Sequence, residues 1–489
     1  MSKVNTAVIF SALGQYATQI ISFVTIVFLA RILTPAEIGM FAIAGSTIMI
    51  AGELRTFGIT QYLVREKELT REKTQAVLGL AVGISWFLGL IVVVAAPFVA
   101  DFYAEPALKW LLWILSVTFF VSPFTSIAGG LWTRELNFRP IFIRNLISAG
   151  VNGGASISLV LMGYSYYGLA VGAILALLSE LIVTIIYNPK NGAWIPKFHR
   201  VPGLLQVGFY ISLTGMFSRF SEGIPDLVIG RFSSTASVGL FSRGLGAILF
   251  IKRLLVQAVG PVVLPHLSEV RRSGGSVAGA YLKAINLLVV VLWPVMAVAS
   301  AAAYPMIRLL FGDQWDASIP LTSILALWAM LTYAHYFGNA ALIAVDHEKL
   351  MFQIGLVCCG ILLIAVAAGA ATLSLENVAW AMVIAGLFEA VVYVWALAKA
   401  IDLKVKDLFQ TLTPNLFIAF CCWAVTKLLD YMVVFEEQSA WFSIAVIAPT
   451  LVVTWLGLLI LMKHPAVDVL VSMMPGVAAK IGLKSNTPT

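Results

Sequence analysis

The sequence predicts an all-α membrane protein with about fourteen transmembrane helices: two parallel repeats of six helices around a central cavity, then two more helices. Of its 489 residues, 60% are hydrophobic and only 11% are charged, which is too few polar residues to cover a water-soluble globule. The apolar residues form continuous runs of about 20, the length of a spanning helix, and not the alternating pattern of a β-barrel. A short motif also recurs 200 positions later in the chain.

Fourteen apolar segments are candidate membrane spans, with ends placed to within several residues. They cover residues 8–31, 36–60, 76–100, 109–131, 141–162, 166–188, 207–231, 236–263, 282–305, 318–344, 350–372, 376–399, 411–430 and 442–462. The first is too long for a signal-peptide core and lacks a small-residue cleavage site, so we expect it to be retained. The longest connections, near 189–206 and 264–281, are too short to form a separate domain.

The recurring motif is a helix–turn–helix unit. Residues 31–41 read RILTPAEIGMF and residues 231–241 read RFSSTASVGLF, with Arg, Ala, Gly and Phe at matching places. We expect Thr34 to cap the second helix of the first copy, with Glu37 completing a capping box, and Ser234 to cap the second copy.

The glycines of the motif, Gly39 and Gly239, are expected to permit close helix approach just inside the membrane. A tight helical hairpin with no binding role explains all of these turn residues, and we prefer that interpretation.

Two further pairs of segments support the repeat. Residues 101–106 (DFYAEP) and 313–320 (DQWDASIP) each precede a span, and residues 134–139 (RELNFR) and 344–349 (AVDHEK) are charged turns between paired spans.

Six spans separate the copies, and because six is even, both copies have the same orientation and relate by an axis along the membrane normal. The sequence therefore predicts an N-terminal lobe over 1–200, a C-terminal lobe over 201–402, and two extra spans with a cytoplasmic tail over 403–489.

The distribution of basic residues predicts the orientation. Most of the 31 Lys and Arg residues lie in alternate connections and at the two ends, and only Arg31, Lys109, Arg231 and Arg308 lie on the opposite side. The positive-inside rule then places both termini in the cytoplasm. The net charge of +7 follows from this bias, so we expect no nucleic-acid partner.

The cysteines form two adjacent pairs, at 358–359 and 421–422, inside predicted spans. Neighbours on a helix point in different directions, so these pairs suit apolar packing better than metal binding. We expect no metal site and no cofactor.

Ionisable residues inside the spans are the candidate functional residues. In segment 207–231, Arg219, Glu222 and Asp226 recur at i, i+3 and i+7, on one helix face. Each charge near the bilayer centre costs about 2.5–3.5 kcal/mol on insertion scales, so this face must meet protein or water.

Segments 236–263 and 36–60 add further charges. Four cations are candidates for substrate contact in the cavity: Arg219, Lys252, Arg253 and Arg55. Four residues are candidates for coupling or gating: Glu222, Asp226, Arg243 and Glu53.

Several of these charges have plausible partners at similar depth. We expect Asp226 to pair with Arg243, and Glu53 to pair with Arg55 or Arg253. A purely structural role that holds lobes or gates explains such pairs equally well, and Lys252 and Arg253 can also reach the cytoplasmic interface.

Four other polar residues inside or beside the spans receive no functional role. His335 fits a hydrogen-bonded packing histidine better than a proton relay. Glu180, Glu389 and Lys427 stand singly or near span ends, and we assign them nothing.

Four stretches of the chain stand out together: ARILTPAEIGMFA, GLWTRELNFR, DLVIGRF…GLFSR and FGDQWDAS. They resemble Wzx-type polysaccharide flippases, in the colanic-acid and succinoglycan exporter branch of the MOP superfamily, and the resemblance covers roughly residues 5–460. It implies a flippase that moves an undecaprenyl-diphosphate-linked oligosaccharide from the cytoplasmic to the periplasmic leaflet of the bacterial inner membrane, for polysaccharide biosynthesis and exopolysaccharide export.

The resemblance also implies a V-shaped, two-lobed bundle that works by alternating access in contact with membrane lipids. Coupling to H⁺ or Na⁺ is a secondary expectation, and contact with the polymerase machinery stays open. A cavity between lobes needs only a monomer. The chain has no GxxxxGK[ST] motif, so ATP is not expected to drive transport directly.

Other classes fit less well. Ion-coupled drug antiporters of the MATE type, the main alternative, usually carry a carboxylate in the first span, where this chain has Gln15 and Gln19. Residues 61–74 lack the major-facilitator signature, and the first-span arginine of the lipid II flippase is missing. A membrane glycosyltransferase needs catalytic carboxylates on a sizeable loop, so we do not expect an enzyme. A scaffold that does not transport stays open.

Overall fold

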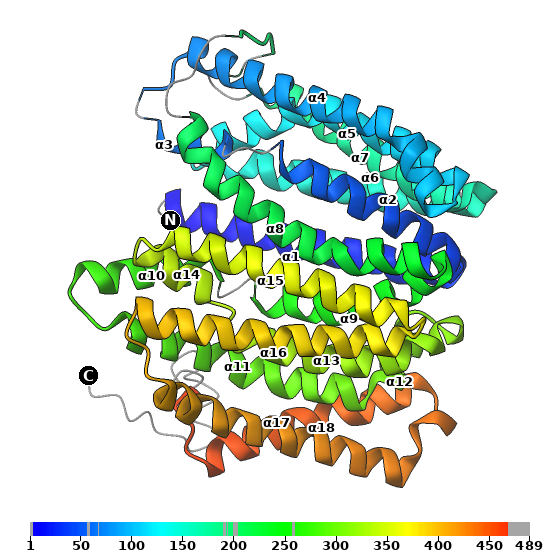
Figure 1. Cartoon of the computed structure of the whole chain (residues 1–489), viewed down its shortest axis with the longest axis vertical. Helices are drawn as coiled ribbons and strands as arrows, with labels where there is room; N and C mark the ends of the chain where they lie inside the picture. The colour runs from blue at the N-terminus through cyan, green and yellow to red at the C-terminus, as the bar shows by residue number, and fades with distance from the viewer. Residues whose placement is uncertain are drawn as a thin grey trace. The chain divides into compact units, whose positions relative to one another are not determined.

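The structure is a computed structural model that describes residues 3–55, 59–66, 68–188, 192, 194–198, 204–256 and 260–467. Every regular element within those ranges is a helix (Figure 1). The chain divides into two compact units. The first comprises Met1–Ser242 and Gly355–Val378, and the second comprises Arg243–Ile354 and Ala379–Thr489.

The first unit holds the helices of the predicted N-terminal lobe together with α8 and parts of three others. Its elements are α1 (Lys3–Ile32), α2 (Pro35–Glu53), α3 (Ile59–Arg65), α4 (Arg71–Tyr103), α5 (Pro106–Arg134), α6 (Phe138–Leu159), the π-helical turn Val160–Tyr164, α7 (Ser165–Ile186), α8 (Leu204–Phe232), the start of α9 (Thr235–Val256) and most of α15 (Glu348–Ala371). The start of α16 (Leu375–Ala400) also belongs here.

The second unit holds most of the remaining helices. Its elements include α10 (Gly260–Arg272), α11 (Val277–Ala301), α12 (Ala303–Leu310), the 3₁₀ turn Asp313–Ser318, α13 (Ile319–Tyr333), α14 (Gly338–Ala344), most of α16, α17 (Val405–Val433), the 3₁₀ turn Phe435–Glu437 and α18 (Ala440–Leu461). Within it α17 packs on α11, and α18 packs on α12 and α17 (Figure 1).

Eleven helical segments in the described chain are long and apolar enough to cross a membrane, which confirms a multi-pass, all-α membrane protein. One of the eleven, Phe138–Ile186, contains both α6 and α7, joined through a kink at Gly163. Helices α8 and α9 are not among the eleven, and both carry several ionisable residues. The merged segment and these two helices account for the difference between eleven segments and fourteen predicted spans. The number fourteen stays a prediction.

Two predicted boundaries differ from the structure. Helix α9 ends at Val256, and α10 occupies much of the predicted connection 264–281. Hydropathy misses α10 because its sequence, GPVVLPHLSEVRR, mixes apolar and polar residues. The predicted span 318–344 is broken between Tyr333 and Gly338, so it consists of α13 and α14. Half of the other long connection, 189–206, lies outside the described residues.

The predicted caps of the repeated turns are confirmed. The Glu37 backbone N–H donates to Thr34 Oγ1 at 3.3 Å, and the Thr34 N–H donates to Glu37 Oε2 at 2.8 Å, which completes the capping box. In the second copy the Ser237 N–H donates to Ser234 Oγ at 3.2 Å.

The close approach at the motif glycines is also confirmed, and it joins one copy of the motif to the other. A Cβ placed on Gly39 would lie 1.7 Å from the carbonyl oxygen of Thr235, and one on Gly239 would lie 1.9 Å from that of Pro35. The first turns of α2 and α9 therefore pack reciprocally, backbone against backbone. Any side chain at either position would force them apart.

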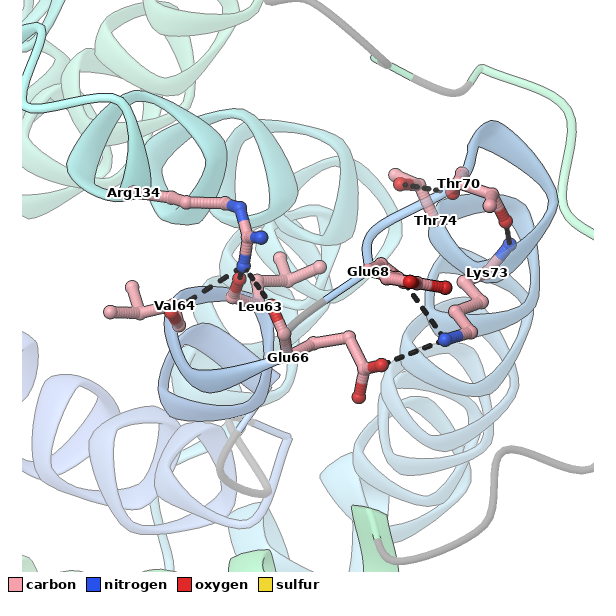
Figure 2. Close-up of polar contacts among 8 residues, drawn as sticks. All are labelled: Leu63, Val64, Glu66, Glu68, Thr70, Lys73, Thr74 and Arg134. Atoms are coloured by element: carbon pink, nitrogen blue, oxygen red, sulfur yellow. Dashed lines mark hydrogen bonds and ion pairs between the residues drawn. The ribbon is translucent and has the colours of Figure 1, made fainter.

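Charged turns tie helix ends together in both units. Arg134, the last residue of α5, donates to the carbonyl oxygens of Leu63 at 2.9 Å and of Glu66, at the end of α3 (Figure 2). In the second unit, Arg271 of α10 donates to the carbonyl oxygen of Ala344 at 2.8 Å, at the end of α14. Both contacts give a cation to terminal helix carbonyls, which otherwise lack partners.

Candidate functional site

Helix α8 packs along α2 through a row of glycines in the first unit. The glycines are 8 and 7 residues apart, a spacing that keeps them on one helix face. Each contacts an α2 side chain: a Cβ on Gly215 would lie 2.5 Å from Glu53 Oε1, one on Gly223 would lie 3.1 Å from Ile50 Cδ1, and one on Gly230 would lie 2.7 Å from Ile43 Cδ1. The small residues let the two helices approach closely, which brings their polar side chains within bonding distance.

Arg219 lies at the centre of the charged cluster on this interface. Its Nη1 donates to Glu222 Oε2 at 2.9 Å, and its Nε lies 3.4 Å from Glu53 Oε2, so the guanidinium links α8 to α2. Side-chain exposures are 47% for Arg219, 50% for Glu222 and 24% for Glu53. Because the three groups remain partly exposed, each ion pair contributes only about 0–1 kcal/mol, and the guanidinium stays within reach of a ligand.

The sequence predicted part of this cluster. The i, i+3 spacing of Arg219 and Glu222 puts both on one helix face, and the structure pairs them there. The Glu53–Arg219 pair was missed, because residues 166 positions apart meet only through the packing of α2 on α8. Pairing of Glu53 with Arg55 or Arg253 stays a prediction.

Asp226 lies two turns of helix beyond Arg219 and contacts α2 through a hydroxyl. Ser46 Oγ donates to Asp226 Oδ2 at 2.7 Å, and next to it Tyr103 Oη donates to the Leu227 carbonyl oxygen at 3.1 Å. No sequence signal marked Ser46 as a partner. Asp226 and Arg243 belong to different compact units, and their pairing stays a prediction.

Arg55, just beyond the end of α2, is directed toward α5. Its Nη1 donates to the Thr118 carbonyl oxygen at 3.3 Å, and its guanidinium carbon lies 5.5 Å from the centre of the Phe119 ring. It lines a small cavity of about 40 Å³ with Ser85 and Ser122. These contacts hold the Arg55 guanidinium against α5, inside the first unit.

The second unit holds the remaining three predicted cations, and two of these lie over aromatic rings. Lys252 Nζ lies 5.1 Å from the centre of the Tyr336 ring and 5.7 Å from that of Tyr333, at the break between α13 and α14. The Arg243 guanidinium lies 5.8 Å from Phe311 and 5.9 Å from Trp315. Cation–π contacts stabilise a cation that has left bulk water.

The third cation and the histidine of this unit lie in different surroundings. Arg253, the third cation, is exposed. His335 stacks on Tyr393, with ring centres 4.4 Å apart, so it is a packing residue as predicted. Its Nε2 has no hydrogen-bond partner among the described residues.

The structure thus brings together Glu53, Arg219, Glu222 and Asp226 along α2 and α8. It places Arg55 against α5, and it places Arg243, Lys252 and Arg253 in the second unit. The α2–α8 cluster holds three carboxylates for one guanidinium. Within the described residues no group of three or more His, Cys, Asp or Glu side chains is placed to hold a metal ion.

Comparison with known proteins gives the family. The profile of a family described as polysaccharide biosynthesis protein matches residues 28–320. The succinoglycan biosynthesis transport protein ExoT of Rhizobium meliloti (strain 1021) is 25% identical over 320 residues, which cover 65% of this chain and 64% of that protein. The teichuronic acid biosynthesis protein TuaB of Bacillus subtilis (strain 168) is 20% identical over 424 residues, 83% of this chain and 85% of that one.

A third relative is the lipopolysaccharide biosynthesis protein WzxC of Escherichia coli (strain K12), 21% identical over 314 residues and 62% of each chain. The matches thus span less than two thirds of the length of ExoT and of WzxC.

Solved structures identify the fold. The lipid II flippase MurJ in an inward closed conformation superposes with a TM-score of 0.73 at 15% identity, over 94% of this chain and all of that one. An inward-facing MATE-family multidrug transporter of the MOP superfamily superposes with a TM-score of 0.64 at 16% identity, over 83% of this chain and 99% of that one. The chain therefore has the fold of these transporters, and because the family profile matches more than half of its length, it belongs to the polysaccharide biosynthesis protein family.

Proposed function

We propose that the protein is a flippase that moves a polyprenyl-diphosphate-linked oligosaccharide from the cytoplasmic to the periplasmic leaflet of the inner membrane. Its family, the transport role in the name of ExoT, and a fold shared with a lipid II flippase all support this proposal. The proposed flippase works by alternating access as a monomer and has no catalytic activity. Its proposed lobes cover residues 1–200 and 201–402, and two extra helices lie within 403–489.

The observation that carries the mechanism is the position of Arg219 between two carboxylates. A guanidinium that already binds Glu53 and Glu222 can exchange these partners for the oxygens of a diphosphate, because its planar donors fit both. In that exchange the Glu53 contact between α2 and α8 is lost. Substrate binding is thereby linked to the packing of two helices that belong to different predicted lobes.

The same exchange suggests a route for ion coupling, which is the secondary part of the proposal. When the phosphate binds the Arg219 guanidinium, Glu53 and Glu222 lose their cationic partner and gain an anionic neighbour. Both changes favour a protonated carboxyl group. Proton binding and phosphate binding would then promote one another. Glu222 is the residue we assign to this role, with Glu53 as its neighbour across the interface.

Reconstitution tests the proposal. Purified protein in liposomes should move a polyprenyl-diphosphate-linked oligosaccharide across the bilayer without nucleotide, as measured by its accessibility to a glycosidase added outside. Glu222→Gln should lose the response to a pH gradient that the parent shows. A variant that responds as the parent does removes Glu222 from coupling, and a parent that moves drugs but no lipid-linked glycan supports the MATE-like alternative.

Orientation is tested separately, by labelling introduced cysteines in intact cells with an impermeant maleimide. We expect both termini and the connections near residues 61–75, 189–206 and 264–281 in the cytoplasm. Cysteines at Glu105 and Glu436 should react from outside, and one at Lys197 should not. Reaction at Lys197 would reverse the orientation.

A further inference from the structure

A polar cavity of about 290 Å³ lies within the first unit, between α1, α6 and α7. On each helix the lining residues recur with helical spacing, so each helix turns one polar face toward the cavity. The polar lining side chains are Thr18 and Ser22 from α1, Asn145, Ser148 and Asn152 from α6, and Glu180 from α7. The α2–α8 cluster contributes none of them.

Close packing of small residues holds the cavity in shape. A Cβ on Gly153 of α6 would lie 2.5 Å from Thr25 Oγ1 of α1, and one on Gly172 of α7 would lie 2.1 Å from Ser156 Oγ of α6. The three helices thus meet at one end of their polar faces, with no room for larger side chains.

The polar side chains in the cavity are only partly satisfied by one another. Ser148 Oγ donates to Glu180 Oε1 at 2.8 Å, and Ser156 Oγ donates to Asn152 Oδ1 at 3.3 Å. The hydroxyl of Thr18 is buried and has no hydrogen-bond partner among the described residues. Polar side chains are costly at membrane depth, so a group of six on facing helices indicates a site for a polar ligand.

The charges around the cavity indicate which ligand it suits. Glu180 interacts electrostatically with Arg55 and Arg144, two guanidinium groups for one carboxylate, which disfavours a bound metal cation. The carboxylate is the one charged group in the lining, which disfavours a phosphate. A neutral ligand rich in hydroxyl groups fits both conditions. Amides and hydroxyls can donate to and accept from such a ligand, and the carboxylate can accept.

We infer that this cavity is a saccharide subsite that binds one sugar ring of the lipid-linked substrate through Asn152, Ser148 and Glu180. The volume is just below the range of about 300–1,000 Å³ for ligand pockets, which suits one ring and not a whole repeat unit. The inference rests on the proposed function for the identity of the ligand as a glycan. It assigns Glu180 a role that the sequence did not indicate.

The test compares binding of two lipids by the full-length protein in detergent. The first lipid is undecaprenyl diphosphate, and the second is a small panel of undecaprenyl-diphosphate-linked hexoses and N-acetylhexosamines. The parent should bind at least one glycosylated lipid more tightly than the bare lipid. Asn152→Ala and Ser148→Ala should each weaken that binding by about fivefold and leave binding of the bare lipid unchanged, as expected for a lost hydrogen bond.

Ser158→Ala is the matched control, because Ser158 lies on the same helix, is exposed, and does not line the cavity. Its binding of both lipids should equal the parent's, and thermal unfolding of each variant checks that the fold is intact. Equal weakening for both lipids in Ser148→Ala, or a parent with no preference for any glycosylated lipid, would overturn the subsite. A parent that binds glycosylated lipid through these residues but does not flip it would instead reject the proposed function.

Discussion

The two copies of the repeated hairpin differ most in the helix that precedes the turn. At a distance of 200 residues, Gln19 of α1 corresponds to Arg219 of α8, and Ser22 corresponds to Glu222. Helix α1 packs on α6 and turns neutral polar residues toward a cavity, whereas α8 packs on α2 and carries a cluster of charges. The turns themselves are alike in capping and in their glycines. The two copies thus share the packing of the turn and differ in the polar side chains of the helix before it.

The largest expected effect comes from removing the polar side chain at corresponding positions of α8 and α1. Arg219→Ala should lower transport of a lipid-linked oligosaccharide by about tenfold or more, since a hydrogen bond to a charged group contributes about 1.5–3 kcal/mol. Gln19→Ala, at the corresponding place in α1, should change transport little. Both are measured in proteoliposomes at equal protein content. Equal losses in the two variants would mean that the copies do not divide their roles in this way.

The second prediction concerns what the copies share. Gly39→Ala should lower the thermal unfolding temperature, because the new methyl would overlap the Thr235 carbonyl, and such overpacking typically costs about 1–3 kcal/mol. Gly239→Ala should do the same through Pro35. Gly45→Ala on α2 and Gly246→Ala on α9 are the controls, since a Cβ there meets nothing within 4 Å. These controls should be neutral or stabilising, as alanine favours helix over glycine. Unchanged stability in Gly39→Ala would contradict this prediction, because it would mean that α2 and α9 can separate at this contact at little cost.

The third prediction asks whether Asp226 has an ionic partner besides Ser46. If Asp226 and Arg243 form a pair, Asp226→Ala and Arg243→Ala should each reduce transport more than the double variant does, because each single change leaves one charge without its partner. Ser46→Ala should have a smaller effect, since it removes one hydroxyl donor and leaves the carboxylate otherwise unchanged. Losses that add in the double variant would rule out the pair.

The smallest expected effect lies at the charged turns, where Asp346 makes an exposed ion pair. Arg134→Ala should lower the free energy of unfolding by about 1–3 kcal/mol, because it leaves the carbonyl oxygens at the end of α3 without their donor. Arg271→Ala should have a comparable effect at the end of α14. Asp346→Asn removes the exposed ion pair with Arg271 at 2.7 Å and keeps a residue type that tolerates the φ of 60° at this position, so stability should change by at most about 1 kcal/mol. Denaturation in detergent measures all three. A larger effect for Asp346→Asn than for Arg271→Ala would contradict this account.

The sequence predicted what depends on local order along the chain. The caps at Thr34 and Ser234 could be read from residues three positions apart, and the spans from runs of apolar residues. It missed α10, because an amphipathic helix has no excess of apolar residues, and it missed the break before Gly338, where Tyr333 and His335 give no local signal for a helix end.

The site was harder to predict than the fold. The charged face of α8 follows from helical spacing. Its partners Glu53 and Ser46 lie 166 and 180 positions away, and they are found only once α2 packs on the glycines of α8. The cavity beside Glu180 is lined by residues of three helices, α1, α6 and α7. Each helix carries a polar face that is unremarkable by itself, so no pattern within one segment indicates the cavity.

The reciprocal contact between Gly39 and Gly239 is formed by the main chain. The nearest atoms to either glycine are main-chain atoms of Thr235, Gly239 and Pro35. A junction built from main-chain atoms carries no group that titrates and no net charge for salt to screen. The atoms in contact therefore do not themselves respond to acidity or ionic strength. A pH signal can reach this contact only through titratable side chains, such as Glu37 in the cap of the same turn, and only by displacing the helices.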